Sequence, residues 1–140
     1  MVTLVAREDA VVIYWDERGF YLADWQPVFC RGEKFKRSFQ AVIDATRARP
    51  GAPWMVDASR MHLIDPADQD WITRWYFPEF ARAGGRRQAG VLPEKRVAKL
   101  STMKALTGVA RDCALELSGH ATRAEAEAAV LAWLEKHGND

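Results

Sequence analysis

Apolar runs of strand length alternate along the chain with longer segments of helical periodicity, and this alternation limits the possible fold classes. Near the start, residues 10–15 and 20–25 are rich in β-branched and aromatic side chains, and a short loop ending in Gly19 joins them. Such a pair is typical of a β-hairpin. Later strands are predicted at 54–58, 87–92 and 113–117, and residues 2–5 are a candidate for a short edge strand.

Four helices are predicted between and after these strands. The first, at 33–49, places five residues on one helical face, namely Phe35, Phe39, Val42, Ile43 and Thr46. The second is predicted to begin with Asp65 as its cap and Pro66 at its first position, and to end before Gly84. The others are predicted at 94–110 and from the capping box of Thr122 and Glu125 to about Lys136.

Strands that alternate with helices imply crossover connections and parallel pairing. A chain of 140 residues is also the usual size of one domain with a core of its own. We therefore predict a single α/β domain over residues 1–140. Its sheet is expected to be mixed but largely parallel, with four to five strands, the hairpin at one side and about four helices.

Charge and composition exclude several classes of protein. Twenty Lys and Arg residues nearly balance nineteen Asp and Glu residues, which argues against a nucleic-acid-binding protein. Charged residues interrupt the only apolar stretch near the start, and no apolar run is long enough for a membrane span. We therefore expect a cytoplasmic protein in which Cys30 and Cys113 are reduced thiols.

No set of residues with the spacing of a catalytic or metal site is visible. His62, His120 and His137 lack partners at metal-ligand spacing, and neither a nucleophile motif nor a phosphate-binding loop is present. We therefore expect no enzymatic activity and no cofactor. Two weaker alternatives remain open, and these are a divalent-metal site among Asp57, Asp65, Asp68 and Asp70, and an anion-binding rim formed by Arg82, Arg86, Arg87, Lys95, Arg96 and Lys99.

The middle of the chain carries a more specific pattern. Residues 54–60 read Trp-Met-Val-Asp-Ala-Ser-Arg, and residues 64–71 read Ile-Asp-Pro-Ala-Asp-Gln-Asp-Trp. Residues 75–78 and 91–93, separated by Gly84, continue the pattern. This string resembles the STAS-like class, in particular a SpoIIAA-like family of small bacterial proteins of unassigned function, over about residues 50 to 100.

The resemblance implies a STAS-like fold and a regulatory or scaffolding role through protein binding. In the founding STAS proteins, a Ser at the start of the helix after the central strand is phosphorylated. Asp65 stands at that place in this chain, so its carboxylate either mimics the modified state or marks the absence of the switch.

The helix between Trp71 and Phe80 carries a broad aromatic arc. Ile72, Trp75 and Tyr76 are expected in the core, whereas Phe77 points away from their stripe on an ideal helix. Pro78 is expected to kink or break the helix near Phe77. Either the helix is covered on two sides, or it presents aromatic residues to a partner, a second copy of the chain or an apolar ligand.

The leading functional hypothesis is therefore a non-catalytic interaction module that binds a protein partner, with a homodimer as one possibility. The alternative is a carrier of a small apolar or lipid-like ligand. The expected partner or ligand surface consists of Asp57, Ser59, Asp65, Asp68, Trp71, Trp75 and Phe77.

Overall fold

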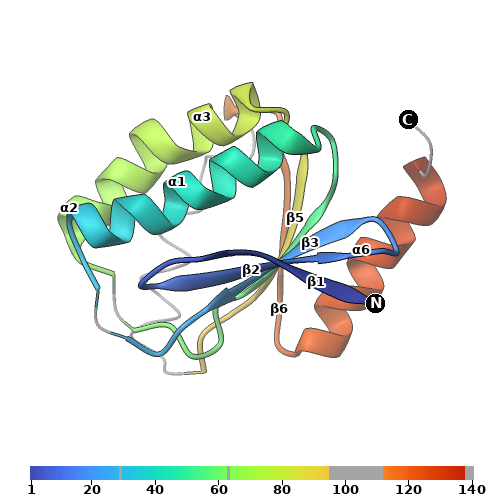
Figure 1. The fold of residues 1–140 in the computed structure, drawn as a ribbon, viewed down its shortest axis with the longest axis horizontal. Coiled ribbons are helices and arrows are strands. Elements are labelled where there is room, and N and C mark those ends of the chain that lie inside the picture. Colours follow the sequence, from blue (N-terminus) through green and yellow to red (C-terminus); the bar gives the residue numbers. More distant parts are fainter. Residues whose placement is uncertain (29, 63, 95–111, 138–140) are drawn as a thin grey trace.

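A computed structural model describes residues 1–28, 30–62, 64–94 and 112–137 and shows a mixed α/β fold (Figure 1). Six strands form one sheet whose spatial order follows the chain order. The strands are β1 (Val2–Arg7), β2 (Val11–Asp16), β3 (Phe20–Trp25), β4 (Trp54–Asp57), β5 (Arg87–Val91) and β6 (Glu116–His120). The described helices are α1 (Glu33–Ala48), α2 (Pro66–Trp71), the π-helical turn η1 (Ile72–Tyr76), α3 (Phe77–Arg82) and α6 (Arg123–His137).

Strand direction changes within the sheet as the hairpin pattern predicts. The first three strands pair antiparallel, and β3 to β6 pair parallel. The β2–β3 turn needs Gly19, whose φ of 116° is unfavourable for a residue with a side chain. The predicted α/β class and the edge strand at the start of the chain are thus confirmed, with six strands in place of four to five.

Helices cover both faces of the sheet (Figure 1). The first face packs against α1 and the α2–η1–α3 helix, and it buries Trp54, Phe39, Ile43, Ile72 and Phe80 among others. The opposite face packs against α6 and buries Phe20, Met55, Ala89, Val91, Ala126 and Val130. Because successive side chains of a strand point to opposite faces, neighbours such as Trp54 and Met55 enter different cores.

The last strand lies later than predicted. The alternating segment 113–117 was expected to be the strand, but Ala114 has a left-handed φ of 56° in a turn and β6 begins at Glu116. Leu115 is buried just before the strand, which explains why the alternation looked like one. The predicted helix at 94–110 lies almost wholly outside the described residues.

The aromatic helix was expected to kink or break near Phe77; it continues through Pro78, and a π-helical turn directly before Phe77 is the irregularity found there. In η1 the amide of Phe77 donates to the carbonyl of Ile72, five residues earlier, so the turn holds one residue more than an α-helical turn. The wider turn brings Phe77 onto the same inner face as Ile72 and Tyr76, and all three are buried. It also leaves Trp75 38% exposed, so the expectation that Trp75 belongs to the core is wrong.

Candidate functional site

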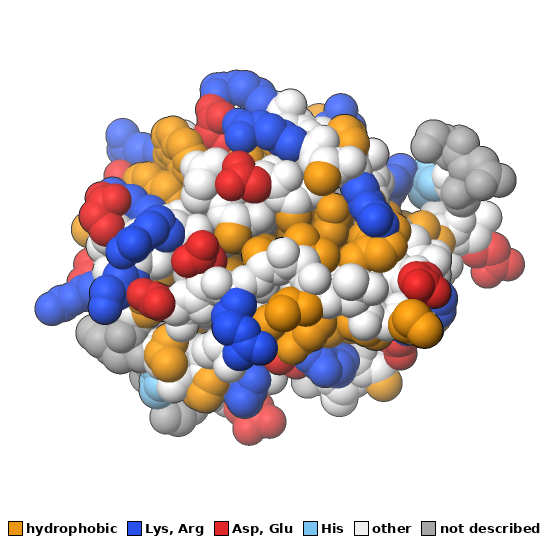
Figure 2. Space-filling view, in the orientation of Figure 1, with side chains coloured by type: hydrophobic (Ala, Val, Ile, Leu, Met, Phe, Trp, Pro, Cys, Tyr) orange, Lys and Arg blue, Asp and Glu red, His pale blue; other side chains and the backbone are white. Residues whose placement is uncertain are grey.

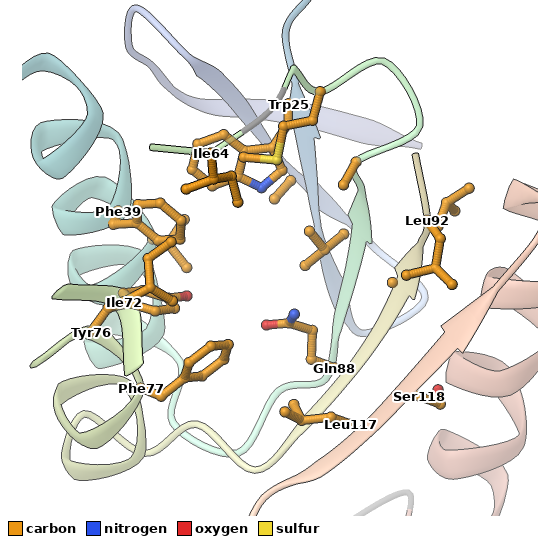
Figure 3. Close-up of a pocket in the computed structure, with 17 residues that line it drawn as sticks. Trp25, Phe39, Ile64, Ile72, Tyr76, Phe77, Gln88, Leu92, Leu117 and Ser118 are labelled. Atoms are coloured by element: carbon orange, nitrogen blue, oxygen red, sulfur yellow. The ribbon is translucent and has the colours of Figure 1, made fainter. Parts of the chain in front are cut away.

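An apolar cavity lies between the helical layer and the sheet, towards the carboxyl ends of β3 and β4 (Figure 3). Its volume is about 70 Å³. Phe39 and Val42 of α1 and the inner residues of the aromatic helix form one wall. In open α/β sheets, ligands bind near the carboxyl ends of the strands, so this is the expected place for a site.

Two features of the local sequence create the cavity. The π-helical turn directs Ile72, Tyr76 and Phe77 inward together, and π-turns are frequent at functional sites. Opposite them, β5 contributes Gly90, which has no side chain to fill the space. A methyl group there would make only ordinary contacts, with its nearest neighbour 3.7 Å away. The space is therefore left by the sequence and is not required by the backbone.

Aromatic packing holds the helical wall in place. The rings of Phe39 and Tyr76 meet edge to face with centroids 4.4 Å apart, and those of Tyr76 and Phe77 lie 5.0 Å apart. Such contacts stabilise the relative positions of α1 and the aromatic helix. The wall is therefore rigid enough to form the cavity before a ligand arrives.

Three side chains of this mostly apolar lining carry polar groups, namely Tyr76, Gln88 and Ser118. Gln88 of β5 directs its amide into the cavity, and Phe77 points into it from the opposite side (Figure 3). The Ser118 hydroxyl lies 2.8 Å from Nε2 of His120, whereas the polar groups of Gln88 and Tyr76 face the cavity. Burial raises the pKa of Tyr76, so this hydroxyl stays protonated and can donate. A ligand with one polar atom could use either group.

Asp57 and Ser59 lie apart from this cavity. The Asp57 carboxylate accepts from the backbone amide of Ser59 at 3.0 Å and from its hydroxyl at 2.6 Å. Its other oxygen lies 3.1 Å from Nε of Arg123 in α6, across the opposite face of the sheet. These contacts occupy the carboxylate, and they tie α6 to the end of β4.

Asp65 and Asp68 both stabilise helix starts. Asp65 accepts from the amide of Ala67 at 3.0 Å, which confirms it as the N-cap of α2, and it lies 3.6 Å from Nη1 of Arg31. Asp68 is only 6% exposed and accepts from the amide of Gly32, the residue before α1, at 3.3 Å. The two residues fix where α2 begins relative to α1.

Trp71 and Trp75 form a separate surface, which we call the tryptophan surface. Their rings stack with centroids 4.9 Å apart and planes at 21°, and Nζ of Lys36 lies 5.5 Å from the Trp71 ring. Phe77, in contrast, is 2% exposed and lines the cavity, so it is not part of this exposed surface. The seven predicted residues thus occupy different parts of the fold and do not form one surface.

Sequence reasoning missed Gln88. A single polar residue in a strand is usually taken for a solvent-facing position, but β5 lies between two parallel neighbours and is covered on both faces. In parallel sheets, central strands are buried on both sides. The available signal was a polar residue within a strand that is expected to be covered on both faces.

No group of three or more His, Cys, Asp or Glu side chains among the described residues could hold a metal ion. Within the same residues, none of the helices has the length and apolar character needed to cross a membrane. Comparison of the chain with models of protein families, with curated proteins and with solved structures gave no match.

Proposed function

We propose that the protein is a non-catalytic binding module that holds a small apolar or lipid-like ligand in the cavity beneath the aromatic helix. The observation that carries this proposal is a mostly apolar cavity into which the Gln88 amide points. Gln88 is half-buried, and its amide has both a donor and an acceptor for a hydrogen bond, so it can pair with a polar atom of a ligand that enters the cavity.

The size of the cavity limits the ligand. An engineered cavity of about 150 Å³ binds benzene, and this cavity of about 70 Å³ is roughly half as large. A slender apolar group, such as part of an acyl chain, fits this space better than a flat ring. The ligand class is therefore a chain with a polar end, and Gln88 and Tyr76 are the groups that would bind that end.

Binding can be tested with decanoate and with decane added to the purified protein, followed by calorimetry and thermal unfolding. We expect saturable binding of decanoate and an increase in melting temperature, because a ligand that binds the native state stabilises it. Val56 also lines the cavity, so Val56→Phe fills it and should abolish binding.

Val2→Phe provides the matched control, because Val2 is 52% exposed on β1 and does not line the cavity. It should bind decanoate as the wild type does. Equal binding by Val56→Phe and the wild type would place the ligand elsewhere and refute the proposal. Circular dichroism of both variants checks that each one is folded.

A second candidate function is the protein-binding module that the STAS-like resemblance implies. The order of elements, with an antiparallel hairpin followed by strands that alternate with helices, agrees with that layout and supports membership of the class. The tryptophan surface supports protein binding, because exposed aromatic residues are enriched at interfaces. Trp75 is the residue whose loss should weaken such an interaction most.

A further inference from the structure

A second concave surface, at the amino ends of β4 and β5, is lined by arginines. It has a volume of about 420 Å³ and shares no lining residue with the apolar cavity. The residues that give it its character are Arg49, Arg86, Arg87, Trp133, Leu134 and His137. Among the described residues, no Asp or Glu lines it. We call it the arginine groove.

Arg49 is the residue directly after α1, and its side chain packs on an aromatic ring. Its guanidinium carbon lies 3.7 Å from the centroid of the Trp15 ring, so the planar group stacks on the indole. It forms no ion pair with a described residue. The stacking orients the cation and leaves its edge donors free for an acceptor.

Arg86 and Arg87 enter the groove from the start of β5. Nη1 of Arg86 donates to the carbonyls of Gly85 at 2.7 Å and Ala81 at 3.2 Å, which fixes the side chain and leaves its other donors available. Nε of Arg87 is buried without a hydrogen-bond acceptor among the described residues, and it lies 3.8 Å from the exposed carboxylate of Glu116. Neither arginine has a carboxylate at hydrogen-bond distance.

Several arginines elsewhere on the described surface lie beside acidic neighbours. Arg74 lies 2.8 Å from Asp70, and Arg47 lies 3.4 Å from Asp44. On the face seen in Figure 2, acidic and basic side chains are interspersed. In the arginine groove three arginines converge without an acidic side chain in the lining, and only Arg87 has a carboxylate nearby, that of Glu116.

We propose that the arginine groove binds an oxyanion of the phosphate monoester class, either as a soluble phosphate ester or as the phosphate of a lipid headgroup. Guanidinium groups bind phosphate oxygens through paired, charge-assisted hydrogen bonds, and the fixed side chains of Arg49 and Arg86 lose little freedom on binding. Trp133 and Leu134 supply an apolar floor beside the anion. The inference is independent of the apolar ligand, since the two sites have separate linings.

The proposal can be tested by titrating the full chain with inorganic phosphate at constant ionic strength and following the NMR signals of arginine Nε–H and tryptophan indole N–H groups. We expect saturable shifts for the arginines of the groove and for Trp133. Arg49→Gln and Arg86→Gln should each weaken binding roughly tenfold, the scale of one lost charge-assisted hydrogen bond. Both positions are exposed, so the variants should fold.

Arg74→Gln is the matched control, because Arg74 is exposed, pairs with Asp70 and lies outside the groove. It should bind phosphate as the wild type does. The carboxyl ends of α1 and α6 border the groove and favour cations, so the arginines could serve only as counter-charges for these helix ends. Shifts that do not saturate, or that are equal in Arg49→Gln, Arg86→Gln and Arg74→Gln, would overturn the proposal. The arginines would then serve only as counter-charges for the helix ends.

A second measurement identifies the source of the phosphate. Phosphatidylcholine vesicles with and without phosphatidic acid are mixed with the protein and separated by flotation. Saturable phosphate binding together with flotation that needs phosphatidic acid and Arg86 supports a lipid headgroup. Saturable phosphate binding without flotation supports a soluble ester, and the absence of both overturns the site.

Discussion

The carboxylate of Asp68 accepts a hydrogen bond from the backbone amide of Gly32 at 3.3 Å, which joins the first turn of α2 to the residue before α1. Asp68 is 6% exposed, so its carboxylate is largely shielded from water although Gly32 itself is exposed. The contact fixes the spacing of the two helices that form one wall of the apolar cavity.

Asp68→Ala should lower the free energy of unfolding by about 1 kcal/mol, the usual net contribution of one hydrogen bond, because it removes the acceptor of the Gly32 amide. Asp68→Asn keeps an acceptor oxygen and should lose less. Urea unfolding measures both. Asp70→Ala, at an exposed position two residues on, is the control and should stay within about 0.5 kcal/mol of the wild type. Equal losses for Asp68→Ala and Asp70→Ala would contradict the role of this contact.

Asp65→Ala should lower the free energy of unfolding by about 1 kcal/mol, the usual effect of losing an N-cap side chain. Asp65→Ser should lose less, because Ser also caps. This pair of variants also separates the cap from a phosphate-like charge, since Ser keeps the first and removes the second. If an interaction partner bound Asp65→Ser as tightly as the wild type, the carboxylate would act as a cap alone.

The Asp16 carboxylate gives the fold a dependence on pH. Its hydrogen bonds with the Arg18 side chain lower its pKa below the ordinary value of 3.8. The pair therefore contributes its full stability above the unfolded-state pKa, and the contribution is lost as pH falls through the folded-state value. Asp16→Asn keeps an acceptor for the Arg18 amide but removes the charge.

Wild type and Asp16→Asn should therefore differ by a constant free energy of unfolding above about pH 5, and the difference should shrink below about pH 4. Urea unfolding at a series of pH values measures this. A difference that persists unchanged to pH 3 would show that the charge of Asp16 has no part in stability.

Phe77→Ala should enlarge the apolar cavity and lower the free energy of unfolding by about 3–5 kcal/mol, the usual range for a buried Phe. The new space is of the size that accepts a ring, so benzene should raise the melting temperature of this variant but not of the wild type. Phe77→Leu keeps most of the volume and should show a smaller loss with little benzene effect. A benzene effect of equal size in wild type would mean that Phe77 does not limit the cavity.

Self-association should depend on Trp75 and not on Phe77. Phe77→Glu would place a charge in the core and unfold the protein, whereas Trp75→Glu changes an exposed residue. If the tryptophan surface joins two copies, Trp75→Glu should be monomeric in sedimentation velocity at concentrations where wild type is dimeric. Val28→Glu, at a 43% exposed position, is the control. If the wild type is already monomeric at high concentration, the tryptophan surface does not join two copies of the chain.

The parts of the fold that local chemistry determines could be predicted from the sequence. The hairpin follows from Gly19 between two β-rich runs, and the start of α2 follows from Asp65 and Pro66. The shift of the last strand could not be predicted, because a turn at Ala114 interrupts a pattern of apolar alternation without changing it.

The candidate site was harder to predict because it depends on contacts between distant segments. Phe77 points inward only because of the π-helical turn, and the Pro78 that was expected to break the helix lies within the continuous stretch. Gln88 can be recognised as a candidate site residue only when β5 is known to be covered on both faces. Local periodicity identifies a broad aromatic arc but cannot say which of its residues surrounds a cavity.

The identity of chain order and spatial order in the sheet has a consequence for folding. Each strand from β2 to β6 pairs with the strand made just before it. No strand therefore has to insert between two strands that are already paired. Pairings between segments close in sequence lose less chain entropy and form faster. The sheet can therefore grow one strand at a time during synthesis: β3 of the hairpin offers the edge for β4, and β4 and β5 in turn offer the edges for β5 and β6.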